Sequence, residues 1–213
     1  MSIRSLFLGA PGSGKGTISS RLLKRFPIGY LSSGDIIRSQ ISQQTSIGKQ
    51  AQDYVQNGSL VPDNLMVSLI LKELESKSWS NWLLDGFPRT INQAKELNKE
   101  TNLNLVIELD VPQNIILDRI NARWVHLKSG RIYNLDYNAP KIPFKDDITG
   151  EPLTKRDDDK PEIFEKRLKK YNEEIKPLKD YYDKQGILYT ISGNTSDIIY
   201  PKLESLIIEK FKL

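Results

Sequence analysis

The sequence predicts an α/β fold, in which a five-stranded parallel sheet carries helices on both faces and two insertions interrupt the alternation. Three observations lead to this prediction. Short apolar runs alternate with segments of helical periodicity, a pattern typical of a parallel sheet covered on both sides. Two stretches depart from the pattern, one all-helical and one rich in glycine and proline. The length of 213 residues suits one domain with inserted segments.

Each strand is predicted from a short apolar run bounded by turn residues. The five strands are expected at 5–9, 30–32, 82–85, 105–110 and 187–192. The helices are expected at 15–25, 36–42, 48–57, 62–76, 90–99, 112–123, 161–184 and 196–212. Pro112 and Pro161 stand where two of these helices begin, in the one turn of a helix that accepts proline.

The two irregular stretches divide the chain into a core and two insertions. We expect the core to comprise residues 1–31, 62–123 and 160–213. The helical insertion spans 32–61, and the insertion rich in glycine and proline spans 124–159. A loop-rich segment of this length inside a compact domain is more often a lid than a linker, so 124–159 is predicted to be a lid. It contains short strand-like pieces such as 131–133, so the lid is expected to be β-rich.

The composition excludes several classes of function. The chain has no cysteine and one histidine, His126, which excludes disulfide frameworks, thiolate catalysis and cysteine-ligated zinc. The net charge of +4 is small and the basic residues are scattered, whereas a nucleic-acid site usually shows as a basic stripe. The amino terminus runs into an apolar strand pattern without the features of a cleaved targeting segment, and no apolar run is long enough for a membrane helix. We therefore expect neither a nucleic acid nor a membrane as a partner.

The strongest motif lies between the first strand and the first helix. The sequence from Gly9 to Lys15 fits G-x-x-x-x-G-K, a loop whose backbone N–H groups point at phosphate oxygens. The amino terminus of the helix adds a partial positive charge, and Lys15 adds a full one. The sequence therefore predicts a polyphosphate site, the alternative being a glycine-rich turn that binds nothing.

One residue of this loop departs from the usual motif. A serine or threonine normally follows the lysine and binds Mg²⁺, but here Gly16 follows it and Thr17 comes next. We therefore expect Mg²⁺ to be held mainly by phosphates and water. Asp85 ends a predicted buried strand and would anchor the waters of the ion, or else it caps a turn or a helix.

Arginines supply a second signal. Arg89 follows the strand that ends at Asp85, and ligands of open α/β sheets bind beyond the carboxyl ends of the strands. Arg89 can therefore hold a phosphate with two hydrogen bonds. Arg119 and Arg123 are four residues apart in one predicted helix and should share a face. Arg25 and Arg131 fall outside the pattern and are expected to be solvated charges.

Taken together, the motifs resemble those of the adenylate kinase family of nucleoside monophosphate kinases over the full length of the chain. The resemblance is carried by 9–17, Ser32-Ser33-Gly34-Asp35 with Arg38, Asp85-Gly86-Phe87-Pro88-Arg89-Thr90 with Gln93, Asp118-Arg119 with Arg123, Arg156-Asp157-Asp158-Asp159, and Arg167. It implies a P-loop NTPase-type fold and the reversible, Mg²⁺-dependent transfer of a terminal phosphoryl group from a nucleoside triphosphate to AMP. The helical insertion would then bind AMP, and the lid would cover the donor.

The resemblance also implies roles for individual residues. The triphosphate would be bound by Gly12, Ser13, Gly14, Lys15, Gly16, Thr17, Arg123, Ile132, Tyr133 and Thr195. AMP would be bound by Ser33, Arg38, Ser59, Leu60, Val61, Gly86, Arg89, Gln93, Arg156 and Arg167, with Gln93 contacting the adenine. The groups acting on the migrating phosphoryl would be Lys15, Arg89, Arg119, Arg123, Arg156 and Arg167. Such a transfer needs positioning and positive charge rather than a general base, which agrees with the scarcity of histidine.

Transfer between two nucleotides must exclude water, because water would otherwise hydrolyse the triphosphate. We therefore expect one insertion to close over the acceptor and the other over the donor. In some members of the family the lid holds zinc through four cysteines. Here the corresponding positions are His126, Ser129, Asp146 and Thr149. The resemblance therefore implies a hydrogen-bonded lid without structural zinc, in which His126 is structural.

Several segments resemble the mitochondrial matrix branch of the family, which prefers GTP to ATP. They are 18–21, 31–33, 82–84, 122–126, 160–162 and 191–193. The resemblance implies GTP as the donor, with ATP as the alternative, and the mitochondrial matrix as the location, with the cytoplasm as the alternative. A complete, self-contained site suggests a monomer.

Two rival functions compete with this one. A GTP-dependent switch shares the phosphate loop, but it needs a serine or threonine after the lysine and a guanine-binding Asn-Lys-x-Asp. The segment Asn98-Lys99-Glu100-Thr101 ends in the wrong residue, and a switch leaves Arg38, Arg89 and Gln93 without a role. A basic RNA-binding protein is the weaker rival, because no basic cluster supports it.

Overall fold

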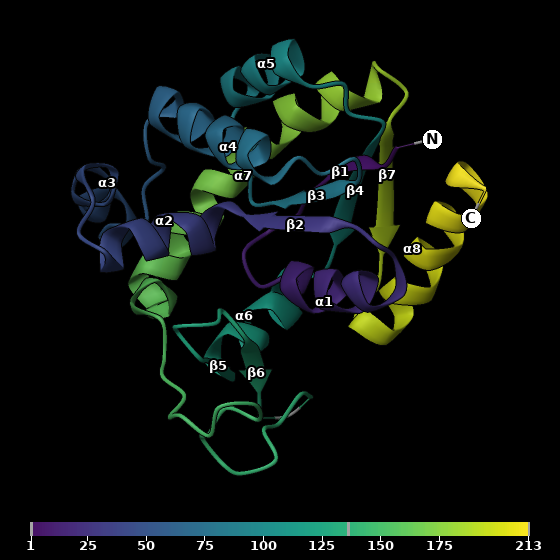
Figure 1. Ribbon diagram of the computed structural model, residues 1–213. Coiled ribbons are helices and arrows are strands. Elements are labelled where there is room, and N and C mark those ends of the chain that lie inside the picture. Colours follow the sequence, from purple (N-terminus) through teal and green to yellow (C-terminus); the bar gives the residue numbers. More distant parts are fainter. Residues whose placement is uncertain (1, 136, 213) are drawn as a thin grey trace.

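The computed structural model describes residues 2–135 and 137–212 and confirms the α/β fold (Figure 1). Five parallel strands form the central sheet in the order β2-β3-β1-β4-β7. They are β1 (Arg4–Leu8), β2 (Gly29–Ser32), β3 (Trp82–Asp85), β4 (Leu105–Asp110) and β7 (Leu188–Ser192). All five agree with the apolar runs of the sequence, and β3 is buried along its whole length.

The strand register brings the chemistry-bearing loops to one edge of the sheet. Phe7 of β1 and Ser32 of β2 both pair with Asp85 of β3. Because the strands are parallel, the loop after β1, the start of the helical insertion after β2 and the turn after β3 leave the sheet side by side. This edge is where ligands of open α/β sheets bind.

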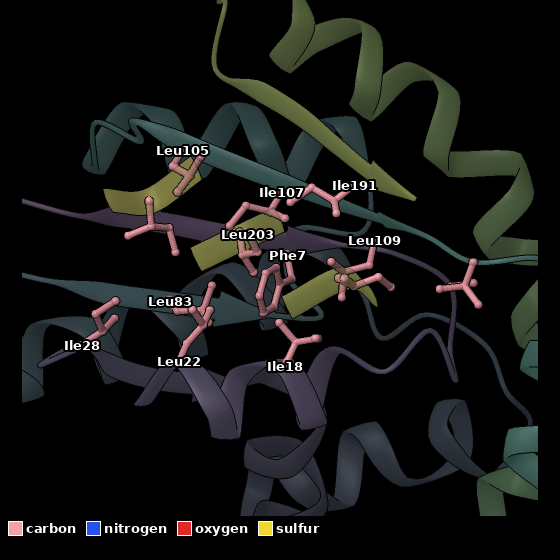
Figure 2. Close-up of a cluster of buried hydrophobic side chains, with 14 of the residues drawn as sticks. Phe7, Ile18, Leu22, Ile28, Leu83, Leu105, Ile107, Leu109, Ile191 and Leu203 are labelled. Atoms are coloured by element: carbon pink, nitrogen blue, oxygen red, sulfur yellow. The ribbon is translucent and has the colours of Figure 1, made fainter. Parts of the chain in front are cut away.

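Two apolar clusters attach helices to the two faces of the sheet. On one face, α1 (Lys15–Arg25) and α8 (Ser196–Phe211) contribute side chains such as Ile18, Leu22 and Leu203, which pack against Phe7 and Ile107 (Figure 2). The other face carries α4 (Asp63–Lys77), α5 (Ile91–Glu100) and the carboxyl-terminal half of α7 (Pro161–Asp183). Burial of these side chains stabilises the core by roughly 1.5–3 kcal/mol for each large aliphatic group.

The helical insertion and the lid extend away from this core (Figure 1). The insertion consists of α2 (Ser33–Ser42) and α3 (Ser46–Gln56). The lid contains the short antiparallel strands β5 (Arg123–Val125) and β6 (Ile132–Asn134), and the 3₁₀ helix η1 (Asp157–Asp159) leads back to α7. Within the part of the chain that the structure describes, no helix has both the length and the apolar character needed to cross a membrane.

One predicted helix is wrong at its carboxyl end. The helix expected at 112–123 is α6 (Gln113–Asn121), and Arg123 is the first residue of β5. Arg119 and Arg123 therefore do not share a helical face. The periodic pattern runs on because Ala122 and Arg123 are compatible with a helix, whereas the pairing of β5 with β6 takes Arg123 into the lid. Pro112 precedes the helix as its cap, while Pro161 is the first residue of α7.

Candidate active site

The phosphate loop connects β1 to α1 in the geometry that its glycines permit. Gly12 and Gly14 have φ angles of 85° and 93°, in the left-handed region that favours glycine. A Cβ on Gly12 would lie 3.0 Å from the side chains of Ile116 and Ile120 of α6, so this position is also too crowded for a larger residue. Lys15 begins α1 and folds back over the loop, where its Nζ donates to the carbonyl of Gly9 at 2.7 Å.

The Lys15 ammonium lies among charged groups from distant parts of the chain. Burial lowers the pKa of Lys15 from 10.5 to about 8; Asp85 opposes this fall, and Arg89, Arg167 and Arg123 add to it. Electrostatic influence of this kind requires proximity. The lysine of the phosphate loop and three of the predicted arginines therefore belong to one site.

Four arginines surround one carboxylate of η1. Burial would raise the pKa of Asp158, but Arg167, Arg38, Arg156 and Arg123 together lower it below its ordinary value. Arg167 Nη1 lies 2.9 Å from Asp158 Oδ2, and Arg38 Nη1 lies 3.8 Å from the same oxygen. These arginines come from the helical insertion, the lid and α7. The structure thus gathers charges that are far apart in the sequence.

Two further acids complete the ion-pair cluster. Arg123 donates through Nε to Asp159 Oδ2 at 2.8 Å and also pairs with Oδ1, so this pair is bidentate. Arg167 lies 3.6 Å from Asp159 as well. Arg156 Nη2 lies 3.5 Å from Asp35 of α2. Each of these arginines is therefore held in place by a carboxylate, a role that the sequence motifs did not assign to the acids.

The arginines still outnumber the acids where they meet. Burial lowers the pKa of Arg156 to about 10, with Arg38 and Arg123 adding to the effect. The Nε of Arg156 is buried without a hydrogen-bond partner among the described residues. Partial desolvation at the wall of the site, with neighbouring arginines contributing, also lowers the pKa of Arg89. A site that concentrates positive charge in this way is suited to bind polyanions.

Most of the residues predicted to contact AMP share one cavity. It lies between the helical insertion, the turn after β3 and the amino-terminal part of α7, and it is lined by Ser33, Arg38, Ser59, Leu60, Val61, Gly86, Arg89, Gln93 and Arg167, among others. Arg89 is exposed to solvent where its side chain lines this cavity, and its Nε donates to Gly86 O at 2.7 Å. The cavity also has an apolar wall formed by Ile37, Met66 and Phe87, which the sequence does not reveal because nothing in the local pattern separates them from core residues.

Residues predicted on the donor side lie near the phosphate loop from three directions. Arg119 Nη2 donates to Asn194 O at 2.7 Å, and a Cβ on Gly14 would lie 3.2 Å from Arg119 Nη1. A Cβ on Gly16 would lie 3.2 Å from the Cδ1 atom of Ile132 in the lid. Thr195 caps α8, where its side chain accepts from the backbone N–H of residue 198.

Two other members of the donor set differ in their surroundings. The Ser13 hydroxyl in the loop is buried and has no hydrogen-bond partner among the described residues, so it is available to a ligand. Tyr133, by contrast, is buried inside the lid, where its hydroxyl donates to Asp146 Oδ1 at 2.9 Å. The structure therefore does not bring the Tyr133 phenol to the phosphate loop.

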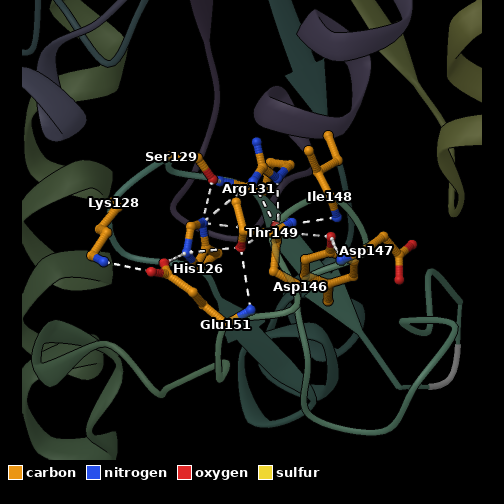
Figure 3. Close-up of polar contacts among 10 residues, drawn as sticks. His126, Lys128, Ser129, Arg131, Asp146, Asp147, Ile148, Thr149 and Glu151 are labelled. Atoms are coloured by element: carbon orange, nitrogen blue, oxygen red, sulfur yellow. Dashed lines mark hydrogen bonds and ion pairs between the residues drawn. The ribbon is translucent and has the colours of Figure 1, made fainter.

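The four lid positions that were compared with zinc ligands lie in one hydrogen-bonded cluster (Figure 3). His126 Nδ1 and Ser129 Oγ are 2.7 Å apart, and Thr149 Oγ1 donates to Asp146 Oδ2 at 2.9 Å. Arg131 donates to both oxygens of Asp146, at 2.7 and 2.6 Å. The expectation of a solvated Arg131 is therefore wrong, because this side chain joins the two halves of the lid through a buried carboxylate.

The lid also reaches the helical insertion. A Cβ on Gly130 would lie 3.3 Å from Asp35 Oδ2, and Arg156 at the end of the lid pairs with the same aspartate. Both insertions therefore meet above the edge of the sheet where Lys15 and the arginines lie. This arrangement encloses the site from two sides.

The chain is similar to known proteins over most of its length. The family model described as adenylate kinase matches residues 7–187. A protein of Saccharomyces cerevisiae named "GTP:AMP phosphotransferase, mitochondrial" is 54% identical over 219 residues, which cover 98% of this chain and 94% of the relative. A second protein of that name from the same yeast is 54% identical over 208 residues (93% and 92%). A protein of the same name from Drosophila melanogaster is 43% identical over 201 residues (94% and 93%).

Proposed function

Because the chain belongs to the adenylate kinase family, we propose that it is a GTP:AMP phosphotransferase. It transfers the terminal phosphoryl group of GTP to AMP, reversibly, to give GDP and ADP. The observation that carries the proposal is one cluster of ion pairs, in which Arg38 and Arg167 contact Asp158, Arg123 contacts Asp159 and Arg156 contacts Asp35. Lys15 of the phosphate loop lies near the same arginines. A switch or an RNA-binding protein has no use for such a cluster between two covers.

We assign the donor to the phosphate loop. Backbone N–H groups of residues 12–17 and the amino terminus of α1 would bind its phosphates, together with Lys15, the free Ser13 hydroxyl and Thr17. The donor base would lie between the lid and the β7–α8 turn, near Ile132 and Thr195. Tyr133 would contact the donor only through its backbone, because its hydroxyl donates to Asp146.

The acceptor is assigned to the cavity beside the helical insertion. Arg38 and Arg89 would hold the phosphate of AMP, and Gln93 would contact its base. The backbone of residues 59–61, the Ser33 side chain and the backbone turn at Gly86 would complete the enclosure. The apolar wall supports this assignment, because a purine needs a flat hydrophobic surface beside a few polar contacts.

The chemistry follows from charge and position. Phosphoryl transfer places negative charge on the equatorial oxygens of the migrating group, and converging arginines stabilise that charge. Arg123, Arg156 and Arg167 would exchange their carboxylate partners for phosphate oxygens, so they are already oriented when the nucleotides bind. Arg119 would act from the donor side. No group needs to serve as a strong base, since the attacking phosphate of AMP is already ionised.

Mg²⁺ fits the residues at this edge of the sheet. Asp85 is a buried carboxylate close to Lys15 and accepts a hydrogen bond from Tyr30 at 2.9 Å, and carboxylate oxygen is a ligand type that Mg²⁺ accepts. Asp85 would hold waters of the ion, while the phosphates supply most direct ligands. When bound, Mg²⁺ neutralises charge on the phosphates. A structural zinc ion is not part of the proposal, because the lid has polar side chains in place of thiolates.

The choice of GTP and a location in the mitochondrial matrix are proposed from the names of the relatives. ATP and the cytoplasm are the respective alternatives. A monomer is proposed because the site draws all its charged groups from one chain. The partners would then be nucleotides alone, without nucleic acid or a membrane.

Initial-rate assays with GTP, ATP and ITP as donors and AMP as acceptor test the proposal. We expect GTP to give the highest kcat/KM, with transfer strictly dependent on AMP and on Mg²⁺. A chain that uses ATP better than GTP would be an ATP:AMP kinase of the same family. Slow hydrolysis of GTP that is indifferent to AMP would reject the kinase and favour a switch.

A further inference from the structure

Gln93 is held by two groups whose hydrogen-bonding roles cannot be reversed. Its side chain is buried, its Oε1 accepts from the backbone N–H of Arg89 at 2.7 Å, and its Nε2 donates to Asp63 Oδ1 at 2.8 Å. A backbone N–H only donates and an ionised carboxylate only accepts. If the carboxamide turned over, it would face a donor with its nitrogen and an acceptor with its oxygen. The two contacts therefore fix one orientation.

The Gln93 carboxamide keeps hydrogen-bonding capacity for a ligand. A carboxamide has two N–H donors and two oxygen lone pairs, and one of each is used by Asp63 and Arg89. One N–H and one lone pair are left, on a side chain that lines the acceptor cavity. Adenine presents an amino donor beside the N1 acceptor, which matches this pair. Hypoxanthine presents a carbonyl acceptor beside an N1–H donor, which matches only the reversed carboxamide.

Asp63 is itself held in place. It is the first residue of α4, and its second oxygen, Oδ2, accepts from the Thr90 hydroxyl at 2.9 Å. Thr90 caps α5 by accepting from Gln93 N at 3.1 Å. Asp63, Thr90 and Gln93 thus form a closed ring of hydrogen bonds between the starts of two helices. Such a ring, with each oxygen of Asp63 used, resists rotation of any one member.

We propose that Asp63 is a positioning residue that sets the choice of acceptor base, by locking the Gln93 carboxamide in the orientation that accepts adenine and disfavours 6-oxopurines. Asp63 lies outside the set of residues assigned to bind nucleotide and acts only through Gln93. The inference rests on the proposed acceptor site. It adds to that site the group that makes its base selection directional.

The test compares AMP with IMP as acceptors for the wild type, Asp63→Asn and Glu162→Gln. Asparagine has nearly the shape of aspartate, but its amide can also donate to the oxygen of a reversed Gln93. The residue at position 63 then no longer fixes the orientation, and only the backbone N–H of Arg89 still opposes reversal. Glu162 is the matched control, because it is an exposed acid in the first turn of α7 and loses the same charge from a helix amino terminus. KM and kcat are measured for both acceptors at saturating donor, together with calorimetric binding of AMP and IMP and the Tm of each protein.

We expect Asp63→Asn to raise the KM for AMP about tenfold and to reduce the AMP/IMP ratio of kcat/KM about tenfold, the effect of losing one hydrogen bond to a charged group. The donor KM and the kcat at saturating AMP should stay within about twofold, and Glu162→Gln should match the wild type. An unchanged AMP/IMP ratio in a folded Asp63→Asn would overturn the proposal, as would an equal loss for donor and acceptor.

Asp63→Glu keeps the proposal testable if the asparagine variant does not fold. Glutamate retains an acceptor-only carboxylate, so the AMP/IMP ratio should remain near that of the wild type even if both KM values rise. A loss of preference in this variant would count against the orientation argument. A wild-type chain that fails to phosphorylate AMP would reject the proposed function instead, and the binding of AMP and IMP to the variants would still decide the role of Asp63.

Discussion

Replacing Lys15 by methionine should remove phosphoryl transfer and stabilise the folded chain at neutral pH. The side chain brings a full charge into the phosphate loop, where burial and three arginines oppose it and Asp85 only partly compensates. Methionine fills similar space without a charge. The same substitution therefore removes the group that we propose to bind the donor phosphates, and it relieves an electrostatic cost in the folded state. Function and stability should change in opposite directions.

The pKa of Lys15 sets the size and the pH range of the effect. A fall from 10.5 in the unfolded chain to about 8 in the folded chain corresponds to roughly 3 kcal/mol. Below pH 8 both states carry the proton, so the wild type bears the full cost of the buried charge. Between pH 8 and 10.5 the folded chain has released its proton and the unfolded chain has kept it, so wild-type stability rises with pH. The advantage of Lys15→Met should thus shrink by about 2 kcal/mol from about pH 8 to about pH 10.

Urea unfolding followed by the fluorescence of the three tryptophans measures this difference across the pH range. Subtracting the variant from the wild type cancels the other titrating groups. Lys24→Met is the matched control, because it makes the same substitution at an exposed lysine on the same helix. In parallel, wild-type kcat/KM for the donor should fall above about pH 8, as Lys15 of the free enzyme loses its charge. A stability difference that stays flat between about pH 8 and about pH 10 would refute the reasoning.

Three further predictions concern the acceptor, the helical insertion and the lid. Arg89→Ala should raise the KM for AMP by at least about tenfold and the donor KM much less, in steady-state assays that vary each nucleotide; equal losses would argue against an acceptor role. Gly48→Ala would place a Cβ 2.0 Å from Gln40 O, which should lower the free energy of unfolding by about 2 kcal/mol. Calorimetry should then show a lower Tm, by roughly 2–4 °C for each kcal/mol lost. Asp146→Ala removes both hydrogen bonds that Arg131 donates in the lid, so the donor KM should rise several-fold while the AMP KM changes little. An unaltered donor KM would show that donor binding does not depend on this part of the lid.

The elements that the sequence predicted well are those whose signal is local. The phosphate loop combines a fixed glycine spacing with a buried strand before it and a helix after it, and each part is visible within about 20 residues. The five core strands are short apolar runs, and in inner strands such as β3 and β4 burial on both faces of the parallel sheet makes that pattern nearly continuous. Gly12 and Gly14 adopt left-handed φ values for the reason that the motif requires.

The lid was harder to predict because its order comes from contacts between distant residues. The strand-like run at 131–133 predicts β6, but β5 and β6 have three residues each, too few to establish a period, and the sequence does not show that they pair with one another. Because of this pairing, Arg123 lies in β5 rather than in the predicted helix, and the Tyr133 side chain points inward, toward Asp146. Arg131 likewise gained a buried partner fifteen positions away. None of these outcomes has a signature in the neighbouring sequence.

The acids of the site have a structural role that the sequence motifs do not reveal. Asp35, Asp158 and Asp159 stand in the motifs that suggested the family, yet only the arginines received a role there. In the folded chain each of these acids pairs with arginines. A cluster of unpaired arginines would repel itself and lose the order that catalysis needs. The ion pairs with these carboxylates make the cluster compatible with a stable fold. In the proposed mechanism phosphate oxygens replace the carboxylates when the nucleotides bind, so the same acids that lower the net charge would also preserve the geometry for transfer.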